Sequence, residues 1–298
     1  MLKQIIGPLA LACATTCGLA QNAAVEQVRG RTQTVGREDT ADLRMITEDR
    51  GQVVELNGKP ARSFKFRTGV STALEHHSNA RLLGSGPVDD WTFAAAVEAG
   101  VNKPLGEKFS LDLSVRADVA NYFQLERLSY WGPSATALFD YRPRDGWPRL
   151  FVGGQLYRYD LFDTGAKITS AGALITGVDH TWVFRGGKSS LSAGYQFSQF
   201  WASPNFEDRA SHTLFATYTH QLATKLFAQA SYVWQYTDFE KQARYDSRHV
   251  IGLGLIYVPV EKLSVRLYAN FVRNESSNPF TDYEDFTSGL GAAFMLQF

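Results

Sequence analysis

The chain of 298 residues contains only two cysteines, Cys13 and Cys17, and both lie near its start. If that stretch is removed from the mature protein, no thiol is left to form a disulfide or to bind a metal. After residue 20 the sequence also lacks any apolar run of the ~18 residues that a membrane-spanning helix requires. An excess of one charge is equally absent. The 30 basic and 30 acidic residues balance, so no overall positive field favours nucleic acid as a partner.

The first twenty residues have the features of a cleaved secretory signal peptide. Lys3 precedes a mostly apolar stretch over 5–19, and Gly18 and Ala20 supply small side chains before Gln21. Such a segment is removed on export and is not a membrane anchor, so we expect a signal peptide over 1–20. The alternative is a lipoprotein signal ending at Cys13, for which Ala10-Leu11-Ala12 is a poor version of the motif.

Apolar side chains alternate with mostly small or polar ones along 286–298, the last segment of the chain. Every even position except Ser288 is apolar, and the run ends on Phe298. Because side chains alternate across a strand with period two, the apolar set shares one face. That face suits lipid and the opposite face does not, which predicts a strand in the wall of a membrane barrel.

Segments of strand length recur from Arg62 to the end, separated by turn-forming residues. Their number is even, which returns the chain to the side where the barrel began. We therefore predict an all-β fold, a transmembrane antiparallel up-and-down β-barrel of twelve strands. The predicted strands are 62–74, 90–100, 108–119, 131–142, 149–161, 168–184, 190–202, 210–221, 225–238, 247–258, 263–274 and 285–298. A soluble antiparallel sandwich, which would also alternate, is the alternative.

The connections between these segments alternate in character. One set is mostly short and rich in Gly, Pro and Lys, as expected for periplasmic turns: 101–107, 143–148, 185–189, 222–224 and 259–262. The other set is generally longer and more charged, as expected for outer loops: 75–89, 120–130, 162–167, 203–209, 239–246 and 275–284.

Two parts of the chain carry a family resemblance. The string Val272-Arg273-Asn274-Glu275-Ser276-Ser277-Asn278, followed by Tyr283, resembles the last hairpin of β-barrel porins and of the barrels of surface lipoprotein assembly modifiers. The end of the chain, with Phe294, Leu296 and Phe298, resembles the insertion signal of bacterial outer-membrane barrels. The resemblance extends loosely over 62–298. It implies location in the cell outer membrane, contact with its lipid, and recognition by the barrel assembly machinery through the C-terminal strand.

Residues 21–61 differ from the barrel segments because they are polar and charged, with sparse apolar positions. Val53, Val54 and Leu56 precede Asn57-Gly58, a dipeptide that favours a tight turn and predicts a small hairpin. The segment is either a disordered periplasmic tail, favoured by the small amount of apolar surface, or a plug that folds into the lumen.

One constellation of residues suggests chemistry, at the top of the first predicted hairpin. His76, Ser78 and Asp90 supply a base, a nucleophile and an orienting acid, with Asp89 as the alternative acid. The string His-x-Ser-Asn-Ala at residues 76–80 is similar to the catalytic segment of outer-membrane lipid A deacylases, and close to that of outer-membrane phospholipase A. A second Ser-Asn pair at Ser277-Asn278, also followed by acids, instead indicates ordinary loop chemistry.

Strand parity predicts which polar side chains face the lumen, because Arg or Lys on the lipid side costs roughly 2–4 kcal/mol at the membrane midplane. Both signs of charge and several tyrosines occur in this set, which can line a hydrated channel or form a closed salt-bridged plug. The predicted lumen-facing residues are Lys65, Arg67, Glu98, Asp112, Arg116, Asp118, Asp140, Tyr157, Tyr159, Asp179, Arg248, Arg266, Tyr268 and Asn270.

These observations support three functional hypotheses. The first is a narrow porin-like channel for transport of small polar or sugar solutes by passive diffusion. The second is an outer-membrane acyl hydrolase, and the third is a non-conducting barrel that displays its loops. No pair of histidines has metal-ligand spacing, and we expect no cofactor. Calcium held by outer-loop carboxylates stays open, with the candidates Asp89, Asp90, Glu207 and Asp208.

Overall fold

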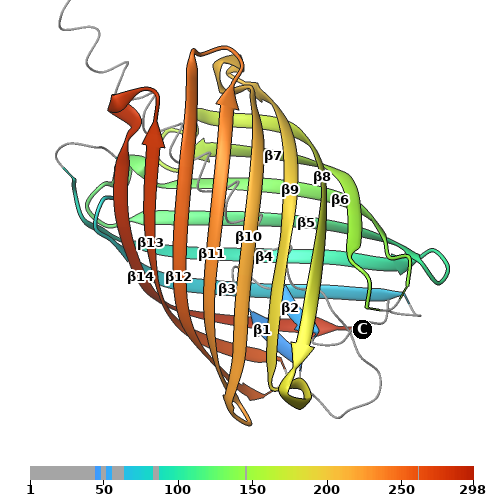
Figure 1. The fold of residues 1–298 in the computed structure, drawn as a ribbon. Helices are drawn as coiled ribbons and strands as arrows, with labels where there is room; N and C mark the ends of the chain where they lie inside the picture. Colours follow the sequence, from blue (N-terminus) through green and yellow to red (C-terminus); the bar gives the residue numbers. More distant parts are fainter. Residues whose placement is uncertain (1–43, 48–51, 56–63, 83–86, 145, 261) are drawn as a thin grey trace, which may run out of the picture.

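The computed structural model describes residues 44–47, 52–55, 64–82, 87–144, 146–260 and 262–298 (Figure 1). Within these ranges, twelve antiparallel strands follow one another around a closed barrel, and the last pairs with the first. The barrel strands are β3 (Lys65–His77), β4 (Asp90–Pro104), β5 (Phe109–Tyr122), β6 (Tyr130–Tyr141), β7 (Arg149–Leu161), β8 (Lys167–Phe184), β9 (Ser189–Ser203), β10 (Arg209–Ala223), β11 (Leu226–Phe239), β12 (Arg244–Val260), β13 (Leu263–Ser276) and β14 (Tyr283–Gln297). The predicted barrel is therefore confirmed.

The remaining elements are short. A separate hairpin pairs β1 (Arg44–Thr47) with β2 (Gln52–Glu55), and β1 lies close to β12 and β13. The turn expected at Asn57-Gly58 lies outside the described residues. In the described hairpin, residues 52–55 pair with 44–47, which precede them in the chain. The 3-10 turns are η1 (Glu126–Leu128), η2 (Arg185–Gly187), η3 (Asn205–Glu207) and η4 (Pro279–Thr281). No helix in the described ranges is long and apolar enough to cross a membrane.

Each predicted strand overlaps an observed one, and the differences lie at the strand ends. β4 continues to Pro104 and β12 begins at Arg244, inside segments predicted to be connections. At the start of β12 the charges of Arg244 and Asp246 misled the prediction, although both side chains are buried on the inner wall. Inside a barrel a charged side chain can face the lumen, so charge does not mark the end of a strand.

The two ends of the barrel differ in their connections. The end that we name the turn end carries the start of β3, the end of β14 and the connections 105–108, 142–148, 185–188, 224–225 and 261–262. The opposite end, the loop end, carries the connections 78–89, 123–129, 162–166, 204–208, 240–243 and 277–282. These are the sets predicted from sequence to be periplasmic turns and outer loops.

The outer wall of the barrel is apolar and the inner wall is mixed. On β12, Ile251, Leu253 and Leu255 are exposed on the outside, and Leu253 retains 60% of its accessible surface. The residues between them face inward, and the inward face of β10, the second strand along, is largely hydroxyl-bearing. A closed barrel with this outer wall satisfies its backbone hydrogen bonds internally and presents hydrocarbon to hydrocarbon, which is the requirement for crossing a membrane with strands.

Two adjacent glycines on β7 show that the inner wall is more crowded than the outer wall. A Cβ atom added to the inward Gly153 would lie 2.0 Å from the carbonyl oxygen of Ala137, an impossible contact without movement of the backbone. A Cβ atom added to the outward Gly154 would meet nothing nearer than the carbonyl oxygen of Ala173 at 3.5 Å. The inner wall therefore requires a glycine at this register and the outer wall does not.

We expect Gly153→Ala to lower the free energy of unfolding by about 1–3 kcal/mol, because the added methyl group overlaps the adjacent strand. Gly154→Ala is the matched control and should change it by less than ~0.5 kcal/mol. Urea unfolding of both variants in lipid vesicles, followed by tryptophan fluorescence, measures the difference. Equal effects of the two substitutions would contradict the assignment of Gly153 to the crowded inner wall.

Candidate functional site

A belt of ion pairs lines the inner wall of β3 to β8 toward the turn end. Arg67 of β3 reaches past β4 to Asp112 of β5, with Nη1 2.7 Å from Oδ2, and its Nε lies 3.2 Å from Glu98. Farther around the barrel, Arg149 of β7 lies between Asp140 of β6, 3.3 Å away, and Asp179 of β8. The belt joins strands through opposite charges, and the side chains of Arg67 and Asp112 remain partly accessible to solvent.

A second polar group occupies the middle of the same wall and the adjoining strands. Arg116 contacts Asp118 at 2.8 Å, and Arg266 donates to the side-chain oxygen of Gln229 at 3.0 Å. The hydroxyl of Tyr268 donates to Glu75. Ser71, Glu75, Arg116, Arg266 and Tyr268 surround a cavity of about 30 Å³, room for about one water molecule.

Glycines on intervening strands allow the long side chains to cross. The guanidinium of Arg67 lies over Gly100 of β4, where an added Cβ would be 2.8 Å from its Cζ. The hydroxyl of Tyr268 lies over Gly289 of β14 in the same way, 2.7 Å from an added Cβ. Each crossing residue thus bonds to the second strand along, Asp112 in one case and Glu75 in the other, because the strand between carries no side chain there.

The predicted lumen-facing residues therefore separate into three groups. Arg67, Glu98, Asp112, Asp140 and Asp179 form the belt, and Arg116, Asp118, Arg266 and Tyr268 form the central group. Tyr157 and Tyr159 instead pack into an inner apolar cluster with Tyr130, Ile175 and Phe200. Lys65, Arg248 and Asn270 share the parity of these groups, and Arg248 and Asn270 are buried. Arg149 was missed, although its alternation with Leu150 and Val152 signalled an inward position.

The segment 78–82, which follows β3, folds inward and contacts both halves of the inner wall. Leu82 is buried in a cluster with inward side chains of β10 to β14, among them Phe215, Val250 and Val272. Two residues earlier, Ala80 is buried in the apolar cluster of β5 to β9. Leu82 has φ of 51°, a conformation that an L-residue with a bulky side chain adopts only when its surroundings hold it. The segment 78–82 therefore narrows the lumen near the loop end.

Asp285 of β14 anchors this segment. Its carboxylate accepts the backbone N–H of Asn79 at 2.9 Å and the hydroxyl of Ser78 at 3.2 Å, and it lies 3.2 Å from Nδ1 of His77. Thr287 donates to the same carboxylate at 2.9 Å. Sequence reasoning assigned Asp285 no contact with the first hairpin, because only barrel closure brings β14 beside β3.

Of the residues suggested for hydrolysis, the base His76 contacts the alternative acid Asp89, whereas Ser78 and Asp90 have other partners. His76 faces outward, with Nε2 3.7 Å from Asp89 and its ring against Trp91. Ser78 donates to Asp285 and accepts the backbone N–H of Phe286 at 2.7 Å. Asp90 is buried and accepts the backbone N–H groups of Trp91, Gln124 and Leu125, which fixes the next loop. Among the described contacts none joins Ser78 to an imidazole, so the geometry resembles loop anchoring more than a catalytic triad.

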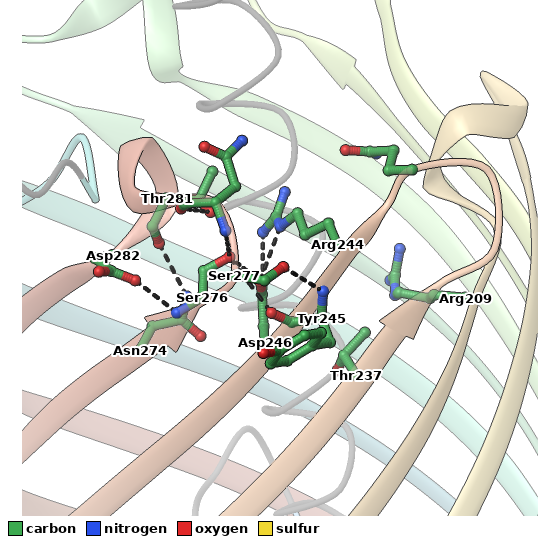
Figure 2. A network of polar contacts seen from close by, with 12 residues as sticks. Arg209, Thr237, Arg244, Tyr245, Asp246, Asn274, Ser276, Ser277, Thr281 and Asp282 are labelled. Carbon is green, nitrogen blue, oxygen red and sulfur yellow. Dashed lines mark hydrogen bonds and ion pairs between the residues drawn. The ribbon is translucent and has the colours of Figure 1, made fainter.

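The second Ser-Asn pair also lies in an anchoring network, at the loop ends of β12 and β13 (Figure 2). Asp246 accepts Nε of Arg244 at 2.8 Å and the hydroxyl of Ser276, while the hydroxyl of Ser277 accepts the backbone N–H of Tyr245 at 2.9 Å. Asp282 accepts the backbone N–H of Ser276. These contacts close the last loop onto its neighbours.

Glu207 at the end of η3 is fully buried at the loop end. Burial raises the pKa of its carboxyl, and the hydrogen bond from Thr169 and the charges of Arg209 and Arg244 oppose this without cancelling it. The hydroxyl of Thr169 donates to Oε2 at 2.8 Å. The guanidinium of Arg209 donates to the hydroxyl of Tyr157 at 3.2 Å and lies over the Phe200 ring.

The suggested calcium ligands are not gathered in one place. Asp90 is engaged with backbone amides as described, and Asp208 accepts the backbone N–H of Ala202 at 2.6 Å. Within the part of the chain that the structure describes, no three His, Asp or Glu side chains are grouped so as to hold a metal ion.

Comparisons with known proteins identify the fold. No family model matches the chain, and no curated protein sequence matches it. Among solved structures, the chain is similar to an outer-membrane channel from Pseudomonas putida F1, with TM-score 0.54 and 10% identity over 87% of this chain and 100% of that one. It is more distantly similar to the β domain of the Bordetella autotransporter Brka, with TM-score 0.45 and 14% identity over 77% and 98%. LpxR from Salmonella typhimurium gives TM-score 0.42 and 10% identity over 76% and 99%.

At these identities the likeness shows the fold alone. Together with the apolar outer wall, that fold makes the chain an outer-membrane β-barrel. The resemblance to the barrels of surface lipoprotein assembly modifiers stays a prediction.

We expect Asp285→Asn to release the segment 78–82 from β14, because charge-assisted hydrogen bonds contribute roughly 1.5–3 kcal/mol each. Trypsin should then cleave after Arg81 about tenfold to a hundredfold faster, since the open form is more populated. Glu284→Gln is the matched control, as Glu284 is the exposed neighbour on the other face of β14. Unchanged cleavage in Asp285→Asn would show that the anchor lies elsewhere.

Proposed function

We propose that this barrel is a narrow channel for passive diffusion of small polar solutes, sugars among them, across the outer membrane. The observation that carries the proposal is the belt of ion pairs on the inner wall. Arg67, Glu98 and Asp112 face the lumen from three neighbouring strands and stay partly accessible to solvent. Charges of both signs keep water in a lumen and allow hydrogen bonding to uncharged polar solutes without strong retention of ions.

The width of the lumen supports a narrow channel rather than a wide one. Eight-stranded barrels are filled by side chains and barrels of 16 or more strands hold open channels, so twelve strands lie between these cases. The inward-folded segment 78–82, with Leu82 packed against the inner wall, narrows the opening further. We propose that this segment sets the size limit for solutes.

Contacts of Ser78 do not favour the hydrolase hypothesis, because its hydroxyl is bonded to Asp285 and to the backbone of Phe286 on β14. The contact of His76 with Asp89 is the one that the hypothesis expects between base and acid. For biogenesis, we propose that the signal peptide directs export and that the exposed Phe294 and Phe298 of the last strand are recognised by the barrel assembly machinery. Leu296 shares their face.

The first test is single-channel conductance of the refolded protein in a planar bilayer. We expect steady current that scales with salt concentration, and a larger unit conductance in Leu82→Asp, since a buried charge is driven out of an apolar cluster. Leu105→Asp in an exposed turn is the control and should leave conductance unchanged. Absence of current in every form would overturn the channel and favour a barrel that displays its loops.

A second test concerns ion selectivity. Removing two cations from the central group in the double variant Arg116→Gln/Arg266→Gln leaves acids of the inner wall such as Glu98 and Asp118 in excess, so the reversal potential in a KCl gradient should shift toward potassium. Arg273→Gln is the control, because Arg273 lies on the outer wall. Equal reversal potentials for the wild type, the variant without Arg116 and Arg266, and the Arg273→Gln control would place the conducting path away from Arg116 and Arg266.

A further inference from the structure

A groove crosses the outer wall from β3 to β9, with alanines and glycines at its floor between larger apolar side chains. It has a volume of about 750 Å³, and its ends are marked by Phe66 toward the turn end and Trp201 toward the loop end. Hydrogen-bonded neighbours form its rows: Ala99, Val115, Ala135, Leu156, Gly172 and Trp201 face one another in succession across β4 to β9. Val101, Leu113, Ala137 and Gly154 form the adjacent row.

Two outward glycines of this groove, Gly154 and Gly172, are not required by the packing of the barrel. An added Cβ at Gly172 would meet only Cδ2 of Leu156 at 3.4 Å, and at Gly154 only a carbonyl oxygen at 3.5 Å. By contrast, the outward positions Ile251, Leu253 and Leu255 of β12, on another side of the barrel, are all large. The depression at Gly154 and Gly172 is therefore not imposed by the packing of the strands.

Two cations and two hydroxyls lie directly beyond the groove at the loop end. The row next to Leu156, Gly172 and Trp201 consists of Arg158, Ser170 and Ser203, which pair in the same register. Nζ of Lys167 lies 2.7 Å from Oγ of Ser203, which brings the second cation to this row. Arg158 is 56% exposed on the outer wall, and its Nε contacts Asp160 at 2.8 Å. Among the contacts described at this row, the single negative charge of Asp160 faces the two positive charges of Arg158 and Lys167.

This combination matches a lipid with a negatively charged headgroup. An Arg near the end of a strand lies at the membrane interface, where its charge costs little and it can meet a phosphate. Below it the groove faces the hydrocarbon of the membrane.

We propose that the outer wall binds one anionic lipid specifically, with a phosphate of its headgroup at Arg158 and Lys167 and an acyl chain along the groove past Gly172. The site lies on the opposite face of the wall from the lumen, so it does not depend on the channel proposal.

The test is titration of the purified protein in detergent with phosphatidylglycerol, followed by native mass spectrometry. We expect one phosphatidylglycerol bound in preference to phosphatidylcholine. Removal of both cations with Arg158→Gln and Lys167→Gln should weaken binding about 25-fold, at about fivefold for each cation near a membrane surface. Gly172→Leu should abolish the preference by filling the groove, since its side chain has room to be accommodated.

Matched controls exist on the opposite side of the barrel. Arg273 is 54% exposed on the outer wall of β13 and pairs with Glu275, as Arg158 pairs with Asp160. Arg273→Gln should leave binding unchanged, and so should Ala230→Leu, a small-to-large change on the outer wall of β11. Shift of the barrel band on unheated gels verifies that each variant is folded.

Three results would overturn the proposal. Equal losses in Arg158→Gln and Arg273→Gln would mean ordinary lipid around the barrel. Binding of inorganic phosphate that survives Gly172→Leu would mean an anion site without an acyl groove. Conversion of a wild-type dimer to a monomer by Gly172→Leu would mean that a second copy of the chain fills the groove. Conductance of the same variants is read separately, so failure here and failure of the channel are distinguishable.

Discussion

Closure of the sheet is the constraint on which the rest of this structure depends. Phe66 and Phe298 exchange backbone hydrogen bonds at 3.1 and 2.9 Å, and β14 runs along β3 from there to the loop end. In a membrane an open sheet edge would leave a row of unpaired amides in hydrocarbon, each at a cost of several kcal/mol. Closure removes that edge. It also creates an inside and an outside, so that parity along each strand decides which residues meet lipid and which meet one another.

The inner wall is organised by residues that reach past a neighbouring strand. Arg67 crosses Gly100 to reach Asp112, and Tyr268 crosses Gly289 to reach Glu75. Such contacts tie together strands that are not hydrogen-bonded to each other, and they satisfy charges that would be expensive to bury alone. The same belt that stabilises the wall keeps charged groups beside the lumen. Stability and the proposed conduction therefore rest on one set of side chains, while the proposed lipid site uses the opposite face of the same strands.

Several residues whose types suggest chemistry anchor loops in the structure. Ser78, Asp90, Ser276 and Asp282 each bond to backbone or side-chain groups of a neighbouring strand or loop. Ser, Asn and Asp are frequent in such places because their short side chains bond to nearby amides. A catalytic triad uses the same residue types, so spacing in the sequence does not distinguish the two arrangements. The two arrangements are distinguished by the group to which each hydroxyl is hydrogen-bonded. For Ser78 that group is the carboxylate of Asp285, 207 positions further along the chain.

The sequence by itself determined the barrel, its strand number and the inward position of Arg67, Asp112 and Arg266, because these follow from local alternation and from the cost of charge in lipid. It did not determine the strand ends, since a lumen-facing charge such as Arg244 does not interrupt a strand. Nor did it reveal the role of Asp285, the inward fold of Leu82 or the groove past Gly172. Those features join residues that are distant in the chain. They exist only once twelve strands take one register and close, which no local pattern encodes.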